Sequence, residues 1–200
     1  PCEHPTDNPS SDGHFYCGTC GAQVFAYIKR GNAFYLYTDL TDAIAAAENG
    51  QTVVLRDDVV VSGNGIDIYK EDGGTRTITL NLNNKNITGE GGITVGKLGR
   101  TGGYPNFEDL SIITPTTLNI IGSGSILLNY ALGVDRKSTL NLEGWTGGTI
   151  NIITLGKNTD DGAVNEATFK VGEKAGTINK LEFSNWVTDD ANNTTLSGGT

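Results

Sequence analysis

Three cysteines and two histidines near the N-terminus are the residues best suited to chemistry in this sequence. They include the pair Cys2-x-His4, a spacer of twelve residues, and the pair Cys17-x-x-Cys20. Two closely spaced ligand pairs joined by a loop are what a tetrahedral Cys₃His zinc site requires. Because four protein ligands leave no coordination position for water, we predict that Cys2, His4, Cys17 and Cys20 bind a structural rather than a catalytic Zn²⁺.

Other interpretations of these residues stay open. His14 could replace His4 as the fourth ligand of the metal. A disulfide between Cys17 and Cys20 would leave Cys2 unpaired, and a redox-active Cys-x-x-Cys is expected at the start of a helix in a βαβ unit, which the sequence does not offer. The zinc site could also recruit a partner, although closed zinc sites generally stabilise the short loops that carry them.

Two pairs of neighbouring aspartates, Asp57-Asp58 and Asp160-Asp161, are weak candidates for catalysis by carboxyl groups. Each pair lies within one short segment, beside residue types that are common in turns. Asp160, Asp161 and Glu166 could bind Ca²⁺ weakly, but their spacing is not that of an EF-hand loop. We therefore interpret both pairs as solvated turns and assign no catalytic residue.

The composition limits the possible partners. The chain has 200 residues, a net charge of −9 and 28 glycines, which indicate many turns. Nucleic acid and anionic membranes are unexpected partners, because binding to either begins with a basic surface. No segment approaches the roughly 20 apolar residues that span a bilayer. The chain begins with Pro1 rather than a signal peptide and ends at Thr200, so we expect it to be a piece of a longer protein.

One short helix is predicted at about residues 39–48. Leu40, Ala43, Ile44 and Ala47 have the spacing of one helical face, and Asp39 is placed to cap the N-terminus. Gly50 is expected to supply the left-handed residue that ends the helix. Since a helix this short is not stable alone in water, we expect it to cover the exposed end of a set of strands.

The rest of the chain has a repeated β-pattern. Strand-like segments of similar phase begin at Thr77, Thr117, Thr139 and Thr168. We expect each to be followed by a second strand, and the expected second strands are 92–95, 125–128, 148–152 and 176–179. Irregular repeats of about 22 to 29 residues indicate a solenoid, in which each turn of chain is buried only by its neighbours. Asparagines near the turns could form ladders of stacked side-chain amides, which favours the solenoid. The competing fold is an antiparallel sandwich, since short strands joined by glycine turns also describe that fold.

The segment from Tyr37 through the Asp57-Asp58 pair resembles the opening of right-handed parallel β-helix domains of the pectate-lyase-like superfamily. It is most similar to such domains in surface proteins of Gram-positive gut bacteria. The resemblance implies an all-β fold, a right-handed parallel β-helix (solenoid) with a short N-terminal capping α-helix, here preceded by a small zinc-knuckle appendage. It also implies an extracellular location on the cell surface, and it says more about fold than about activity.

The resemblance also invites a comparison with polysaccharide-cleaving β-helix enzymes. Asn158-Thr-Asp160 matches one element of the polygalacturonase-like set, but both histidines of this chain lie in the N-terminal segment. A pectate-lyase-like calcium site would need aspartates and an arginine stacked over adjacent turns of chain, and Arg56, Asp57 and Asp58 all lie within one. The resemblance therefore supplies no complete catalytic set.

We expect two parts: a zinc-knuckle and hairpin appendage at 1–32, and a parallel β-helix at 33–200. The expected function is a non-catalytic binding, adhesion or spacer module of a bacterial cell-surface protein, which recognises a host protein such as mucin or immunoglobulin, or a glycan. The alternative is a polysaccharide lyase or glycoside hydrolase that acts on uronic-acid polymers.

Overall fold

The protein is predominantly β-structure with mostly parallel pairing. The structure, a computed structural model, describes residues 7–9, 13–69, 74–98, 113–135, 137–157, 167–183 and 195–197, which contain twenty strands and one helix. Of the sixteen strand pairings in these residues, four are antiparallel and the other twelve are parallel. Within the described residues, no helix has the length and apolar character that a membrane span needs.

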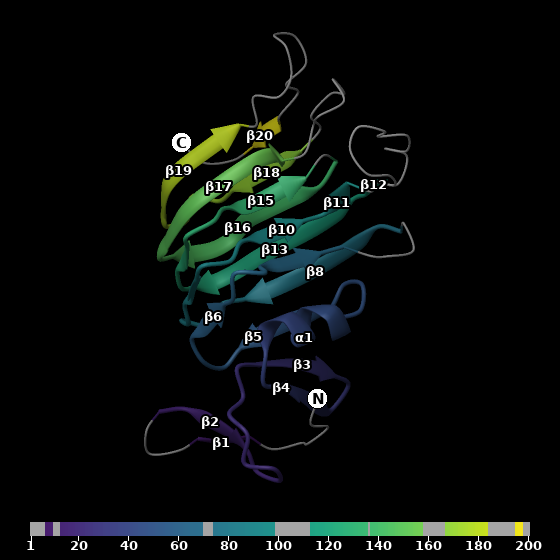
Figure 1. The fold of residues 1–200 in the computed structure, drawn as a ribbon, viewed down its shortest axis with the longest axis vertical. Helices are drawn as coiled ribbons and strands as arrows, with labels where there is room; N and C mark the ends of the chain where they lie inside the picture. The colour runs from purple at the N-terminus through teal and green to yellow at the C-terminus, as the bar shows by residue number, and fades with distance from the viewer. Residues whose placement is uncertain are drawn as a thin grey trace.

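The first large sheet has eight strands, and it runs the length of the molecule (Figure 1). Six of them pair in parallel, and a hairpin of two further strands pairs antiparallel to the N-terminal member of the six. In sheet order the strands are β20 (Thr195–Ser197), β18 (Thr168–Val171), β16 (Thr139–Gly147), β13 (Thr116–Ser123), β8 (Arg76–Asn81), β5 (Thr52–Leu55), β3 (Ala26–Arg30) and β4 (Ala33–Tyr37).

The second large sheet consists of two columns of short strands that join at one long strand, β17 (Thr149–Lys157). The first part of β17 pairs with one column and its second part with the other, and β19 (Thr177–Phe183) pairs along β17. One column is β6 (Val59–Val61), β9 (Ile87–Gly89) and β14 (Ile126–Leu128); the other is β7 (Ile66–Ile68), β10 (Ile93–Val95) and β15 (Leu132–Asp135).

Two small antiparallel pairs complete the described strands. One joins β1 (Asp7–Pro9) to β2 (Phe15–Cys17), and the other joins β11 (Lys97–Leu98) to β12 (Ile113–Thr114). The second pair joins the two ends of the segment 97–114, whose central residues lie outside the described part of the chain.

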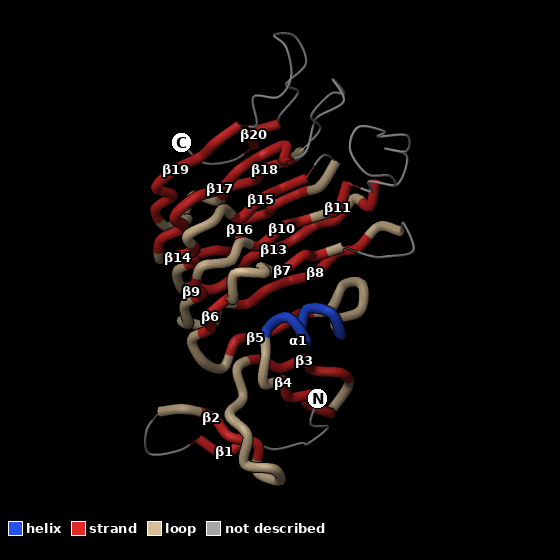
Figure 2. Tube along the Cα trace, viewed as in Figure 1, coloured by secondary structure: helices blue, strands red, loops and turns tan. Residues whose placement is uncertain are grey.

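The chain passes repeatedly through the first sheet and then the second, and returns to the first sheet one strand further along. We call each such round a coil. The coils are β5–β6–β7, β8–β9–β10, β13–β14–β15, β16–β17 and β18–β19. In Figures 1 and 2 the coils are stacked from the N-terminal end of the molecule to the C-terminal end. This parallel arrangement excludes the alternative prediction, an antiparallel sandwich.

Corresponding residues of successive coils lie in register, as the repeats predict. Thr117 pairs with Thr77 on one side and Thr139 on the other, and Thr139 pairs with Thr168. In the second sheet, Ile126 pairs with both Ile87 and Ile150. These three isoleucines are at most 1% exposed, so the core is built of apolar rows that run from coil to coil. Burying each such side chain contributes about 1.5–3 kcal/mol.

One predicted strand partner was wrong. The segment from Gly92 to Val95 was expected to match 125–128 as the second strand of its coil. It instead forms β10, the third strand, which pairs with β7 and β15. The second strand of that coil is β9, which contributes a single inward apolar residue, Ile87. The three-residue strand was overlooked because one apolar residue cannot show a period of two.

The predicted helix is confirmed as α1 (Leu40–Ala46), somewhat shorter than expected. The Asp39 side chain accepts hydrogen bonds from the backbone N–H groups of Thr41 at 2.6 Å and Asp42 at 3.3 Å, as an N-cap does. Leu40, Ala43 and Ile44 are buried against the strands. The helix lies towards the N-terminal end of the stack, where it contacts β3, β4 and β7 (Figure 2).

Gly50 does not end the helix as predicted. The C-cap is Ala47, whose backbone is extended, and Gly50 lies three residues further on with φ +81°. Its N–H donates to the carbonyl of Thr77 at 2.7 Å, so this glycine turns the chain towards the second coil. The helix ends earlier because Ala47 already has an extended backbone (φ −67°, ψ 126°).

Candidate functional site

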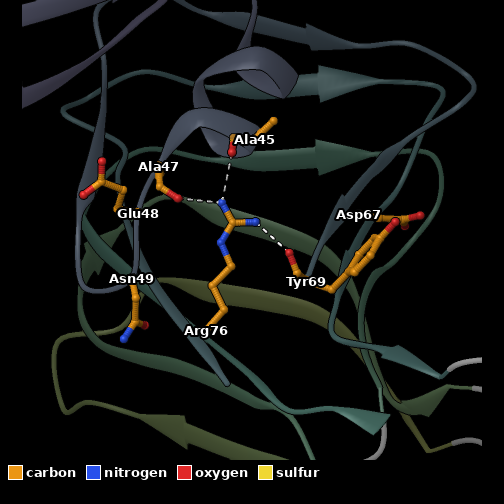
Figure 3. A pocket seen from close by; sticks show the side chains of 7 residues that line it. All are labelled: Ala45, Ala47, Glu48, Asn49, Asp67, Tyr69 and Arg76. Carbon is orange, nitrogen blue, oxygen red and sulfur yellow. Dashed lines mark hydrogen bonds between the residues drawn. The ribbon is translucent and has the colours of Figure 1, made fainter. Parts of the chain in front are cut away.

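A pocket of about 520 Å³ opens at the C-terminal end of α1 (Figure 3). Its walls come from three segments: the end of α1 with the loop that follows, the end of β7, and the start of β8. Among the described residues it is lined by Ala45, Ala47, Glu48, Asn49, Asp67, Tyr69 and Arg76. Pockets of this volume accommodate small ligands.

Arg76 lies at the centre of this pocket and binds backbone carbonyls from two segments. Its Nη2 donates to the carbonyls of Ile44 and of Ala47, the latter at 2.8 Å, and its Nη1 donates to the carbonyl of Tyr69 at 2.7 Å. Burial lowers the pKa of the Arg76 guanidinium below its ordinary value, which is so high that the group stays charged. A cation at the negative end of a helix is favourable, so Arg76 stabilises the cap helix.

Arg30 completes this arrangement from β3. Its Nη2 donates to the carbonyl of Ala46 at 2.7 Å, and its Nε donates to the Gln51 side chain at 3.4 Å. The Ala43 carbonyl accepts from the N–H of Ala47 at 3.1 Å. The carbonyls at the end of α1, which no residue of the helix itself can satisfy, are therefore bound largely by two arginines from distant strands.

Two carboxylates and one aromatic ring lie near Arg76. Glu48 is 3.8 Å from the Arg30 guanidinium and has a side chain 72% exposed, so this ion pair is weak. Asp67 projects outward from β7, and Figure 3 places it on the same side of the pocket as the Tyr69 ring. Asn49 is held in place, since its Oδ1 accepts from the N–H of Thr77 at 2.7 Å.

Asp57, a candidate for catalysis, is buried in a structural contact. Its Oδ2 contacts Nδ1 of His14 and accepts from Nε2 of Gln23 at 2.8 Å, while Oδ1 accepts from the N–H of Asp58 at 2.9 Å. Burial alone would raise the pKa of the Asp57 carboxyl, but the hydrogen bonds from His14, Gln23 and Asp58, with the charge on His14, hold it below its usual value. Asp57 is therefore an ionised anchor for the N-terminal segment.

Asp58, the neighbouring candidate, belongs to a ladder of polar groups at one corner of the stack. Its Oδ1 accepts from the N–H of Asn86 at 2.7 Å, and Asn86 Oδ1 accepts from the N–H of Ser125 at 3.0 Å. Ser125 Oγ in turn accepts from the N–H of Thr149 at 3.0 Å. The other pair, Asp160 and Asp161, lies outside the described residues, as does Glu166.

The predicted asparagine ladders are present in part. Asn179 Nδ2 donates to Asn151 Oδ1 at 3.1 Å, from one coil to the next. Asn86 is a member of the corner ladder, whereas the Asn83 amide donates to the Leu55 carbonyl at 2.9 Å. The side chains of neighbouring coils thus bind one another across the stack.

The predicted metal ligands are described only in part. Cys2 and His4 lie outside the described residues. Cys17 is 3% exposed and packs with Val24 and Leu36, whereas Cys20 is exposed, and the two thiols are not joined in a disulfide. Within the described part of the chain, no three His, Cys, Asp or Glu side chains are grouped so that they could hold a metal.

The chain makes a tight turn around the two cysteines. Gly21 has φ +72° and donates to the Cys17 carbonyl at 2.8 Å, while the N–H of Cys17 donates to the Ala22 carbonyl at 2.8 Å. His14, the alternative fourth ligand, lies against Asp57 instead of with these cysteines. Zinc binding by Cys2, His4, Cys17 and Cys20 stays a prediction.

Comparisons of the chain with protein-family models, curated proteins and solved structures found no match. Function is therefore inferred from the geometry of the described residues. The pocket around Arg76 was missed by sequence reasoning, because its walls meet only after the second coil has formed. A local signal was the arginine directly before Thr77, where the other repeats have Thr116, Ser138 and Ala167.

Proposed function

We propose that the stacked coils form a right-handed parallel β-helix, a solenoid, and that the chain is a non-catalytic binding, adhesion or spacer module of a bacterial cell-surface protein. The partner would be a host protein, such as mucin or immunoglobulin, or a glycan. The observation that carries this proposal is the use of both Asp57 and Asp58 in structural hydrogen bonds. Carboxylates held in this way are poorly placed to move a proton on a bound polymer.

The outer face of the first sheet supports a role in recognition or spacing. Thr77, Thr117, Thr139 and Thr168 stand side by side on successive coils. Next to this row, the Nδ2 of Asn141 donates to Asn119 Oδ1 at 3.2 Å, so neighbouring coils are also linked by side chains. Repeated parallel pairing of this kind gives a long, stiff surface, the property that solenoid binding proteins use.

A binding screen tests the proposal. The chain would be applied to a glycan array and to immobilised mucin and immunoglobulin. Saturable binding to any of these supports a binding module, whereas no binding at high micromolar protein reduces the chain to a spacer. Release of unsaturated or reducing uronate from pectin-like polymers with Ca²⁺ present, with a rate lost in Asp57→Asn or Asp160→Asn, would instead establish the alternative, a polysaccharide lyase or hydrolase.

The zinc site and the location belong to the same proposal. Zn²⁺ bound by Cys2, His4, Cys17 and Cys20 would fix the N-terminal loop without taking part in a reaction. An extracellular module of a larger surface protein fits an acidic chain with polar outward rows. Metal analysis tests the first point, and surface labelling of the intact source cell with antibodies tests the second.

A further inference from the structure

The pocket at the end of α1 combines an aromatic ring, two carboxylates and an amide. We propose that it binds a neutral sugar residue, a hexose or an N-acetylhexosamine at the end of a glycan. This inference rests on the proposed function and specifies its ligand and its location. The volume of about 520 Å³ accommodates one or two sugar rings.

The lining supplies both kinds of contact that a sugar ring needs. The Tyr69 ring offers a flat apolar surface for the C–H face of a pyranose, and aromatic side chains commonly combine such packing with a polar edge. Asp67 and Glu48 present carboxylate oxygens, which accept strong hydrogen bonds from hydroxyl groups. Because the Oδ1 of Asn49 is engaged with Thr77, its NH₂ group remains as a donor.

The charges of the described residues around the pocket disfavour an acidic sugar. Arg76 and Arg30 balance the charges of Asp67 and Glu48, and the carbonyl end of α1 adds about half a negative charge. Moreover, two of the carbonyls near Arg76 come from α1, one from its C-cap Ala47 and one from Tyr69, so the positive charge is already directed at protein oxygens. Among the described residues that line the pocket, a uronate or sialate would meet no uncompensated cation, and a neutral sugar needs none.

The walls of the pocket are held in position before any ligand binds. Arg76 ties the Tyr69 backbone to the end of α1, and Asn49 is tied to β8. Such preorganisation lowers the entropic cost of binding. A single sugar ring has few atoms, so we expect a dissociation constant in the millimolar range.

The test is a titration followed by NMR of the full chain. Neutral hexoses and N-acetylhexosamines would be compared with glucuronate and galacturonate at equal concentrations. We expect saturable shifts with one or more neutral sugars and at least tenfold weaker binding of the uronates. Tyr69→Ala and Asp67→Asn should each weaken the neutral sugar at least tenfold. Tyr130→Ala, which removes a tyrosine 68% exposed elsewhere on the surface, is the matched control and should bind like wild type.

Unfolding curves for each variant would establish that any loss is not a loss of fold. Undiminished binding by Tyr69→Ala would overturn this site but leave the binding-module proposal standing. Uronates that bind more tightly than neutral sugars would overturn the ligand class. If wild type bound no sugar while mucin or immunoglobulin still bound, this inference alone would fail; if none of them bound, the proposed binding function would fail as well.

Discussion

Nη2 of Arg76 donates to the carbonyl of Ala47 at 2.8 Å, and this bond ties the end of the cap helix to the second coil. The two residues are 29 positions apart, with the whole first coil between them. The cap helix is therefore held in place both by its buried apolar side chains and by hydrogen bonds from Arg76. It buries Leu40, Ala43 and Ile44 and contacts β3, β4 and β7, and Arg76 joins it to the second coil.

Replacing Arg76 with alanine should destabilise the protein. The carbonyls of Ile44, Ala47 and Tyr69 would lose a charged donor, and hydrogen bonds to charged groups contribute about 1.5–3 kcal/mol. Arg76→Lys should recover only part of the loss, because an ammonium group cannot reproduce the planar fork. Urea unfolding measures both effects. Lys174→Ala, at an exposed site, is the control, and an equal stability of Arg76→Ala and this control would contradict the capping role.

The buried face of α1 gives a second prediction. Ile44 is 1% exposed, so Ile44→Asp would place a carboxylate in the core and should cost at least about 3 kcal/mol. Asp42→Asn, on the exposed side of the same helix, should change stability by less than about 1 kcal/mol. Thermal unfolding monitored by circular dichroism distinguishes them. Equal tolerance of the two changes would show that α1 does not cover the coils.

Asp57 should make stability depend on acid pH. Its carboxyl has a pKa in the folded protein below the value of the unfolded chain, so it stabilises the folded state at neutral pH. That contribution is present above the unfolded pKa of about 4, and it is lost as the pH falls through the folded value. We expect Asp57→Asn to be less stable than wild type at pH 7 by about 1–3 kcal/mol, and the difference to shrink below about pH 4.

Denaturant unfolding of both proteins across that pH range provides the measurement. Asp58→Asn is the matched control, since an asparagine oxygen can still accept from the N–H of Asn86. A constant difference between Asp57→Asn and wild type at every pH would show that the charge of Asp57 is not what anchors the N-terminal segment.

Close contact between coils should make position 176 intolerant of any residue larger than glycine. A Cβ atom on Gly176 would lie 2.2 Å from the Gly148 carbonyl oxygen and 2.9 Å from the buried ring of Trp145. Gly176→Ala should therefore separate the last coils and cost about 1–3 kcal/mol or more. At Gly63 a Cβ would meet nothing within 4 Å, so Gly63→Ala should be close to neutral. Chemical denaturation of the two variants gives the comparison.

Zinc content tests the N-terminal site. Protein purified without chelators should contain about one zinc per chain, and Cys20→Ser should contain much less. His14→Ala should keep its zinc, because His14 lies against Asp57 rather than with the cysteines. Mass spectrometry of the metal together with a thiol assay decides the matter. Substoichiometric zinc with oxidised thiols in wild type would rule the site out.

The repeated strands could be predicted because their inward residues alternate with threonine and asparagine over several positions. Thr117 and Thr139 fell in the right register for this reason. The strand that contains Ile87 was not predicted, because a strand of three residues with one inward side chain shows no alternation between apolar and polar residues. Short strands at the corners of a stack are recognised from their neighbours in space, and the sequence does not show these neighbours.

The candidate site could not be predicted, because its residues interact with partners that lie far away in the sequence. Asp39 could be identified as an N-cap because its partners are two and three residues away. Arg76 could not be assigned to the other end of the helix, since its partners lie 29 and 32 residues away. Asp57 was recognised as a carboxylate of interest, but its contact with His14 spans 43 residues and gave it a structural role instead.

The antiparallel hairpin of β3 and β4 has a consequence for how the chain is made. β5 pairs with β3 on one side and with β8 on the other, so β8 can add to only one of its edges. The strand that blocks the first edge of β5 is β3, which precedes the first coil in the sequence and is therefore synthesised before it. Each later strand of the first sheet then meets a sheet with one open edge, the one on its C-terminal side. In this sheet, strands of later coils can be added in the order of synthesis.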